Sequence, residues 1–398
     1  MTDPRKTARV EAAEAKRRAE QLEEERRAAR LAKAEAKRAR AAALQRRLTR
    51  EVLFAGRGVS GQLDDIKSDA AALERRGLPL LNDAGDLAAL LGLDMRRLRW
   101  LTYHRDVAEV SHYRQFQIPK SSGGVRTIAA PRRALRAAQQ GVRDHILSKL
   151  SAPEPAHAFV AGRSTLTNAQ PHCGRAILVK ADVTDFFGAI TFPRVRGYFG
   201  SLGYSGMVAT LLALLTTEAK RVAAEVDGRT LYVASGPRSL PQGALTSPEL
   251  TNQIARGIDR RLAGYADKHG WTYTRYADDL TFSGEDAARE RVGPLLGTIA
   301  RVLRDEGFQL NRDKVFVSRA GRQQRVTGVV VNERPGIDRK TLRRFRAAVH
   351  RVSREGFRDR AERRQMLGYA AYVRMIKPEQ GGRFLGALRA APTGGGEA

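Results

Sequence analysis

The sequence predicts an α+β fold in which an antiparallel sheet packs on helices, and two hairpin patterns carry this prediction. In residues 113–129 and in residues 271–283, two runs that alternate apolar and polar residues flank a short turn, which is typical of paired antiparallel strands. Apolar residues at helical spacing fill segments such as 192–217 and 338–375, the second of which reads as two amphipathic helices. A chain of 398 residues is long enough for two or three packed units.

The chain is strongly basic, with 71 Lys and Arg against 43 Asp and Glu and a net charge of +28. Such a charge favours a polyanionic partner and salt-dependent binding. The positive charge is spread along the whole chain, so nucleic acid is preferred as partner over an anionic membrane surface or no specific polyanion. The single cysteine, Cys173, excludes an internal disulfide and a cysteine-rich zinc site and fits a reducing cytosol. Because there is neither an apolar run of membrane-spanning length nor a signal peptide, we expect a cytoplasmic protein without a membrane partner.

Residues 1–50 form the most charged segment, with 16 basic and 8 acidic residues among strong helix formers. This composition predicts one long, solvated, basic helix, and it has too few apolar residues for a coiled-coil seam. Two interpretations stay open: a mobile tail without a specific role, or a docking arm for nucleic acid or another partner. A linker is expected at 56–61, and the leucine spacing over 62–107 predicts a small helical bundle.

The first hairpin, 113–129, places Lys120 and Arg126 near a Gly-Gly turn, and a basic helix is expected to follow over 132–150. Two cations around such a turn can close on phosphates through charge-assisted hydrogen bonds. Most basic hairpins are only solvated turns, so this feature needs support from the rest of the chain.

Three carboxylates stand at the ends of predicted strands. The apolar run 176–182 ends in Asp182, as a buried strand does when it delivers an acid to the edge of a sheet. The second hairpin, 271–283, presents Asp278 and Asp279 at its tip. Taken alone, Asp182 could be a helix cap and the pair an ordinary acidic turn. Taken together they predict a site for Mg²⁺ or Mn²⁺, because adjacent ionised carboxylates call for a cation and both metals prefer oxygen ligands.

Three carboxylates on one surface can hold two divalent ions about 4 Å apart, an arrangement that supports in-line phosphoryl transfer. With a basic clamp over a triphosphate, the residues alone predict a polynucleotide polymerase or a nuclease-like phosphoryl transferase. The other elements expected are a strand at 231–234, a turn at 240–243, a helix from 244 to about 265, a helix over 284–306, and strands at 314–317 and 325–331.

Four motifs stand in the order found in reverse transcriptases: Lys120…Gly123…Arg126, Asp182 with Phe186-Phe187, Leu240-Pro-Gln-Gly243, and Tyr276-Ala-Asp-Asp279. Two more, Asn168-Ala-Gln-Pro-His172 and Val326-Thr-Gly328, match signatures of bacterial retron reverse transcriptases. The chain therefore resembles that family over residues 105–331. Leu245 is a mild departure, since the family usually has proline there.

The resemblance implies a right-hand polymerase of fingers, palm and thumb, with an antiparallel palm sheet packed on helices and an N-terminal helical extension. The expected division is a charged helical extension at 1–55, an N-terminal helical region at 56–110, fingers and palm at 111–331, a helical thumb at 332–390 and a disordered tail at 391–398.

The resemblance also implies roles for individual residues. The catalytic carboxylates would be Asp182, Asp278 and Asp279, and the ligands of two Mg²⁺ ions, with Mn²⁺ as an alternative, would be Asp182, Val183, Asp278 and Asp279. Contacts with the incoming nucleotide are expected from Lys120, Arg126, Phe187, Gln242 and Lys314, and Ala181 would border it. Residues expected to contact the RNA or to shape its binding surface are Asn168, His172, Val326, Thr327, Gly328, Arg343 and Arg346. His172 is not expected to bind a metal ion, because no partner His or Cys lies at a suitable spacing.

The implied function is RNA-templated DNA synthesis from dNTPs on a cognate structured non-coding RNA. In retrons a guanosine 2′-OH primes the reaction and the product is branched RNA-linked DNA; a separate effector protein and a role in defence against bacteriophage belong to the same context. The alternatives are another bacterial reverse transcriptase, of the group II intron or diversity-generating type, and a non-catalytic RNA-binding scaffold on a polymerase fold.

Overall fold

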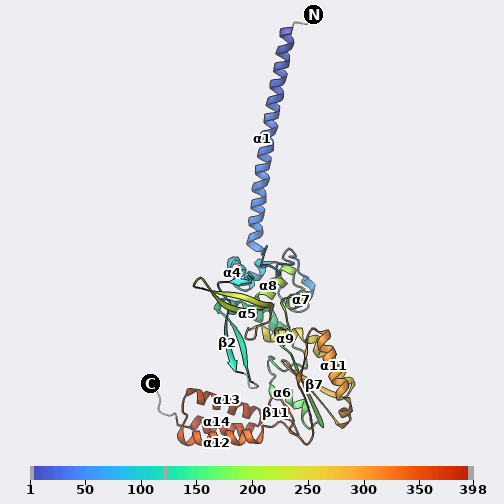
Figure 1. Ribbon diagram of the computed structural model, residues 1–398, viewed down its shortest axis with the longest axis vertical. Coiled ribbons are helices and arrows are strands. Elements are labelled where there is room, and N and C mark those ends of the chain that lie inside the picture. The colour runs from blue at the N-terminus through green and yellow to red at the C-terminus, as the bar shows by residue number, and fades with distance from the viewer. Residues whose placement is uncertain (1–3, 120–122, 393–398) are drawn as a thin grey trace.

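The structure, a computed structural model, describes residues 4–119 and 123–392 (Figure 1). Lys120 of the predicted clamp and the predicted tail beyond residue 392 lie outside the described residues. Within the N-terminal helix, side chains are described from Lys16 onward, apart from Ala19. No described helix is both long and apolar enough to span a bilayer.

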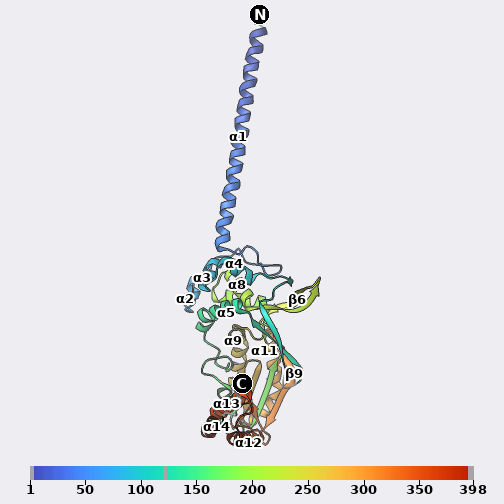
Figure 2. The same ribbon diagram turned by 90° about the vertical axis from the view of Figure 1, so that its left-hand side faces the viewer.

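Helix α1, Pro4–Arg50, extends from the body of the molecule as a single rod (Figures 1 and 2). At 1.5 Å per residue its 47 residues span about 70 Å. Its described side chains are exposed along almost the whole length, as the charged composition predicts. Arg50 anchors its C-terminal end to Asp83 at 2.8 Å and to Asp86 at 2.6 Å. The helix is therefore joined to the body at one end only.

Three short helices cover the upper part of the body: α2 (Ala70–Glu74), α3 (Ala84–Leu90) and α4 (Met95–Thr102). Each begins after an aspartate, Asp69, Asp83 or Asp94, whose side chain accepts a backbone N–H of the first turn. Helices α3 and α4 contact α8 (Gly206–Thr216), every residue of which is buried. The helical bundle predicted for 62–107 is present as these short pieces.

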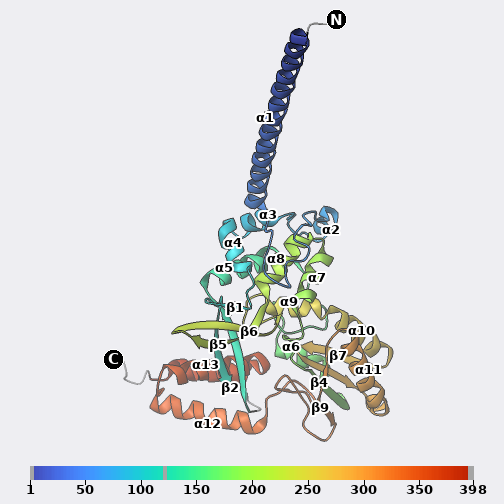
Figure 3. The ribbon, with the colours of Figure 1, turned by 45° about the horizontal axis from the view of Figure 1, so that its top comes forward.

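The fingers contain two antiparallel sheets. Strands β2 (Tyr113–Pro119) and β3 (Val125–Pro131) form the predicted hairpin, which is followed by α5 (Arg133–His145) and the 3₁₀ turn η1 (Leu147–Lys149). A second sheet has the order β1-β6-β5, with β1 (Val107–Ala108), β5 (Glu218–Val226) and β6 (Arg229–Ser239). The strand predicted at 231–234 is therefore one part of a long hairpin. Figure 3 shows β2 descending between the palm strands and the C-terminal helices.

The palm is a four-stranded antiparallel sheet of order β7-β8-β4-β9. Its strands are β4 (Ile177–Val183), β7 (Trp271–Tyr276), β8 (Asp279–Gly284) and β9 (Leu310–Arg319), and the accompanying helices are α6 (Thr165–Ala169), η2 (Gln170–His172), α7 (Phe192–Leu202), α9 (Ser247–Ile254), α10 (Arg256–Lys268) and α11 (Val292–Asp305). The central strand β4 is buried at six of its seven positions, which explains its apolar sequence. The helix expected over 284–306 is wrong at its start, because β8 runs to Gly284 and a 3₁₀ segment, η3 (Asp286–Arg291), precedes α11.

The C-terminal part differs from the prediction in two ways. The single strand predicted for 325–331 is two short strands, β10 (Arg325–Val326) and β11 (Val329–Val330), because Thr327 and Gly328 adopt φ of 45° and 87° and turn the chain. The two helices predicted over 338–375 are present as α12 (Arg339–Glu355) and α13 (Arg360–Ile376), and they are followed by a third helix that was not predicted separately, α14 (Pro378–Ala390). These helices lie together at the lower left of Figure 1 and share a core with the β10–β11 turn.

Candidate active site

Strand register brings two of the predicted carboxylates together. In the pairing of β4 with β8, Asp182 lies directly opposite Asp279, so that their Cβ atoms are about 5 Å apart. Tyr276 pairs with Asp279 in the hairpin β7–β8, which leaves Ala277 and Asp278 as a two-residue turn. The backbone N–H of Val183 donates to the carbonyl oxygen of Asp278 at 3.1 Å. The end of β4 and the hairpin tip therefore form one surface.

The electrostatics of this surface show that the carboxylates interact. Burial is the main cause that raises the pKa of Asp278, and the Asp279 and Asp182 carboxylates raise it further. Burial likewise raises the pKa of Asp279, with a further contribution from Asp182 that Lys180 opposes. Gathering carboxylates in a partly desolvated place costs free energy unless a cation neutralises them. The site is thus arranged for a cation.

Lys314 on β9 supplies a positive charge in this structure. Its Nζ lies 3.0 Å from each oxygen of Asp182, and the pKa of Lys314 is raised chiefly by this hydrogen bond. Asn311 donates to the same carboxylate at 3.2 Å. Asp182 and Lys314 border a cavity of about 310 Å³ whose lining also includes Asp279 and Asp313.

The donors fit a hard divalent cation, although they do not yet enclose one. Over residues 4–119 and 123–392 no three Asp, Glu, His or Cys side chains are grouped closely enough to be a ready metal cage. The three-carboxylate cluster expected from the sequence is therefore open in this structure, with Asp182 held by an ammonium group. All the available donors are oxygens, which suits Mg²⁺ or Mn²⁺, and a divalent ion would have to displace Lys314 from Asp182.

The turn of Ala277 and Asp278 is held by a buried ion pair that the sequence did not predict. Ala277 adopts φ of 56°, a left-handed conformation that costs a non-glycine residue of order 1–3 kcal/mol. The Arg275 guanidinium donates to the Ala277 carbonyl at 3.2 Å and to Asn252 at 3.1 Å. It also forms two hydrogen bonds with Asp259, at 2.8 and 2.6 Å, and both side chains are fully buried. An arginine held from behind thus fixes the strained turn.

The same arginine connects the turn to a neighbouring loop. The backbone N–H of Arg275 donates to Pro155 at 2.7 Å, and the N–H of His157 donates to the Arg275 carbonyl at 2.8 Å. A few residues on, Phe159 meets Phe187 edge-to-face with 6.5 Å between ring centroids. The main chain around Arg275 therefore links the hairpin to the loop that borders Phe187.

The residues expected around the nucleotide lie in different surroundings. Phe187 is half-buried and its ring meets those of Phe159 and Phe186. Gln242 accepts the Ala129 N–H through its main-chain carbonyl at 2.7 Å and so ties the 240–243 turn to the base of the fingers hairpin. Arg126 is exposed on β3, opposite Ile118. These residues share no contact in this structure, and their nucleotide roles stay predictions.

Asn168 and His172 are both fully buried in this structure, and their expected roles in RNA binding stay predictions. The His172 ring is bonded through Nδ1 to Ser283 at 2.7 Å and through Nε2 to Thr274 at 2.8 Å. Burial lowers the pKa of His172 to about 3. The His172 ring therefore joins η2 to both strands of the β7–β8 hairpin.

Asn168 reaches the Val326–Gly328 turn. Its Nδ2 lies 3.5 Å from the Thr327 hydroxyl, which in turn donates to the Thr165 carbonyl at 3.2 Å. Val326 is fully buried, whereas Gly328 is exposed. In this structure Asn168, His172 and Val326 lie beneath the surface, a position that suits the expected role of shaping it.

The thumb presents the predicted basic surface. Arg343 and Arg346 are exposed on α12, as expected for groups that could meet phosphates.

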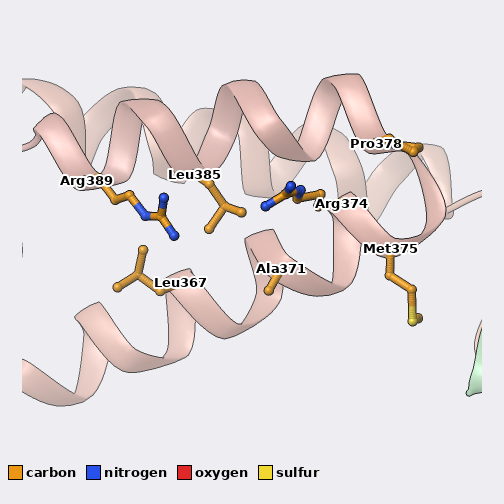
Figure 4. Close-up of a pocket in the computed structure, with 7 residues that line it drawn as sticks. All are labelled: Leu367, Ala371, Arg374, Met375, Pro378, Leu385 and Arg389. Carbon is orange, nitrogen blue, oxygen red and sulfur yellow. The ribbon is translucent and has the colours of Figure 1, made fainter. Parts of the chain in front are cut away.

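A separate hollow of about 650 Å³ lies between α13 and α14, where Leu367, Ala371 and Leu385 face one another between the guanidinium groups of Arg374 and Arg389 (Figure 4). None of its lining residues belongs to the carboxylate cavity.

Comparison with known proteins gives a consistent result. The family model described as "Reverse transcriptase (RNA-dependent DNA polymerase)" matches residues 118–370. The chain is 46% identical to the retron Mx65 reverse transcriptase of Myxococcus xanthus over 83% of its length and 77% of that protein. It is 42% identical to the retron Mx162 reverse transcriptase of the same organism, over 81% of this chain and 70% of that protein. To the retron Ec86 reverse transcriptase of Escherichia coli it is 33% identical, over 70% of this chain and 81% of that protein.

Proposed function

The chain belongs to the reverse transcriptase family, among the bacterial retron enzymes, and from that premise we propose that it copies a cognate structured non-coding RNA into DNA. As a retron reverse transcriptase it is an RNA-directed DNA polymerase. The observation that supports DNA synthesis by this chain is the pairing of Asp182 with Asp279 beside the Asp278 turn, at the edge of a buried palm sheet.

The positions of the carboxylates support an assignment of catalytic roles. Asp182, Asp278 and the main chain of Val183 would hold divalent cations, with Asp279 beside them, and Mg²⁺ is the proposed ion. When bound, such ions activate an attacking hydroxyl and stabilise the charge on the leaving phosphate. Lys314, now on Asp182, would turn toward the phosphates once a cation takes its place, because its side chain is more than half exposed and free to swing.

The nucleotide would enter between the palm and the fingers hairpin. Arg126 and Lys120 would bind the triphosphate from the hairpin, and Gln242 would support the base of that hairpin through its bond to Ala129. Phe187, with Ala181 beside Asp182 on β4, would border the sugar, where an aromatic side chain leaves little room for a 2′-OH. In this proposal the Asn168–Thr327 contact keeps the Val326–Gly328 turn in place against the palm.

The substrate and product complete the proposal. A guanosine 2′-OH of the cognate RNA would prime synthesis, giving branched RNA-linked single-stranded DNA, in the bacterial cytoplasm and as part of a defence against bacteriophage with a separate effector protein. Support for this comes from the retron relatives, while the exposed arginines of α12 would contact the RNA backbone.

The test is expression of the gene together with its upstream DNA, followed by isolation of nucleic acid from the cells. Wild type should yield DNA that stays linked to RNA after denaturation and that a debranching enzyme releases. Asp278→Asn should yield none at an equal protein level. DNA that migrates alone without debranching would contradict the 2′-OH priming, and a wild type unable to extend a primed RNA template would contradict the polymerase itself.

A further inference from the structure

A second cavity lies in the fingers and shares no residue with the carboxylate site. It has a volume of about 440 Å³ and opens between the end of α4, the segment 103–112 and the sheet of β5 and β6. Segment 103–112 leads directly into β2, so the cavity stands at the base of the fingers hairpin. Its size is that of a small-ligand site.

Aromatic rings gather at the rim of this cavity. Trp100 is 43% exposed and Tyr103 is 40% exposed, although side chains of this size usually lie inside a protein. Phe54, 55% exposed, meets the edge of Tyr103 with 6.0 Å between ring centroids. His112 lies edge-on to Trp100 at 4.4 Å and bonds to the Trp100 carbonyl at 3.1 Å. Exposed rings in such a group indicate a surface that binds something flat and apolar.

Positive charge accompanies these rings. The guanidinium of Arg97 lies 4.7 Å from the centre of the Trp100 ring, and that of Arg105 lies 5.0 Å from Tyr103. The cavity is lined by four arginines, Arg99, Arg105, Arg221 and Arg238, against two glutamates, Glu109 and Glu218. An excess of cations disfavours a basic peptide and favours an anionic ligand.

The floor of the cavity is fixed by hydrogen bonds. Arg221 donates to Glu218 at 3.0 Å, to the Tyr232 carbonyl at 3.0 Å and to the Arg105 carbonyl at 2.9 Å. Buried Arg238 donates to the Leu214 carbonyl at 2.9 Å. The segment that carries Tyr103 and Arg105 is thus tied to β5 and β6 before any ligand arrives, and a site ordered in advance loses less entropy on binding.

We propose that this cavity binds an unpaired nucleotide of single-stranded RNA, with the base stacked against Trp100 and Tyr103 and a neighbouring phosphate paired with Arg97 or Arg105. Aromatic faces with arginines beside them are the chemistry by which proteins hold single strands, since every base has a stacking face and every linkage a charge. The proposal rests on the proposed function only in taking RNA as the strand bound. It gives the polymerase a contact with its RNA outside the palm and the thumb.

The chain allows a direct optical test because it contains two tryptophans, of which Trp271 is buried and Trp100 is exposed. In a Trp271→Phe background, a short oligoadenylate RNA should quench the fluorescence of Trp100 by stacking. An abasic strand with the same number of phosphates should not. Trp100→Ala and Tyr103→Ala, followed by fluorescence anisotropy of a labelled RNA, should weaken binding about tenfold. Trp100→Phe should keep most of the affinity, because phenylalanine still stacks.

Equal quenching by the abasic strand would overturn the base-binding site, and so would tighter binding of oligodeoxyadenylate than of the RNA. Unchanged affinity in Trp100→Ala and Tyr103→Ala, with thermal unfolding as in wild type, would overturn it too. Extension of a primed homopolymer template by the same variants separates this proposal from the proposed function. Weakened RNA binding with extension retained supports the cavity, whereas a wild type that binds RNA but extends nothing contradicts only the polymerase.

Discussion

The buried pair of Arg275 and Asp259 makes a quantitative prediction about the catalytic turn. Asp259→Asn would leave the Arg275 guanidinium without its counter-ion at a place where both side chains are at most 1% exposed. Removal of one partner of a buried pair costs about 3–5 kcal/mol, so the melting temperature should fall by roughly 5 °C for a chain of this size. The double variant Asp259→Leu with Arg275→Met removes both charges and should recover most of that loss.

The double variant separates positioning of the turn from stability. It still lacks the donor that reaches the Ala277 carbonyl at 3.2 Å, so the strained turn should relax and Asp278 should move. A displacement of about 1 Å near reacting groups lowers a rate about 100-fold, so we expect kcat to fall 10- to 100-fold with little change in the KM for dNTP.

The assays are thermal unfolding and steady-state dNTP incorporation on a primed RNA template. A matched control is Arg261→Met on α10, the helix of Asp259, with Asp305→Leu on α11, which removes an ion pair of 2.7 Å whose side chains are 35% and 41% exposed. It should cost less than about 1 kcal/mol and leave kcat unchanged. The reasoning is refuted if the Asp259 and Arg275 double variant keeps the wild-type kcat, or if Asp259→Asn melts with the wild type.

Three further predictions concern single positions. Gly381→Ala should destabilise the thumb by about 1–3 kcal/mol in thermal unfolding, because an added Cβ would meet the Arg374 backbone nitrogen at 2.1 Å, while Gly382→Ala next to it has open space and should be neutral or stabilising. Gly243→Ala should raise the KM for dNTP, because this residue has φ of 111° and its Cβ would press on Ile128 at the base of the fingers hairpin. The control is Gly197→Ala, whose Cβ would have nothing within 4 Å, and equal KM values in the two variants would contradict the prediction. His172, whose folded pKa near 3 lies below its unfolded value, stays neutral when folded among His157, Arg175, Ser283 and Thr274, so it should make stability fall as pH drops below about 6.5, by about 1 kcal/mol between pH 7 and pH 5.5. His172→Asn should lose this part of the slope and keep the part from His157, whose pKa burial lowers to about 4; an unchanged slope would count against the prediction.

The parts of the fold that the sequence could predict are those set by local periodicity. The hairpins of β2–β3 and β7–β8 follow from alternation around short turns, and the burial of β4 follows from its continuous apolar run. The sequence predicted that Asp182 and Asp279 would lie close together, and the register of β4 and β8 places them directly opposite each other.

The hairpin of β5 and β6 was missed although a local signal exists. Asp227 and Gly228 both have positive φ, at 49° and 72°, the pattern of a two-residue hairpin turn. Of the flanking strands only residues 231–234 were predicted, because the strands project from the body, so that Val222 and Val226 are exposed and the usual alternation is blurred. Helix α14 was missed for a different reason: Pro378, Gly381 and Gly382 weaken its helical pattern, and packing against α13 forms it nonetheless.

Burial of polar residues could not be predicted from one sequence. An arginine in an alternating strand is expected to face solvent. Arg275 instead points inward because it pairs with Asp259, which lies 16 positions earlier on α10. The same difficulty applies to His172, whose partners Thr274 and Ser283 lie more than 100 positions away. Such contacts depend on the tertiary fold and leave no local pattern.

The most direct test of the active site is templated dNTP incorporation with Mg²⁺ by wild type, Asp278→Asn and Asp313→Asn. All three proteins keep the same size at the changed position, and Asp313 lines the same cavity but is exposed. The proposed mechanism predicts that Asp278→Asn loses incorporation by at least about 100-fold while Asp313→Asn stays within about threefold of wild type. Incorporation by Asp278→Asn at the wild-type rate would contradict the assignment of the β4 and hairpin carboxylates as the catalytic metal site.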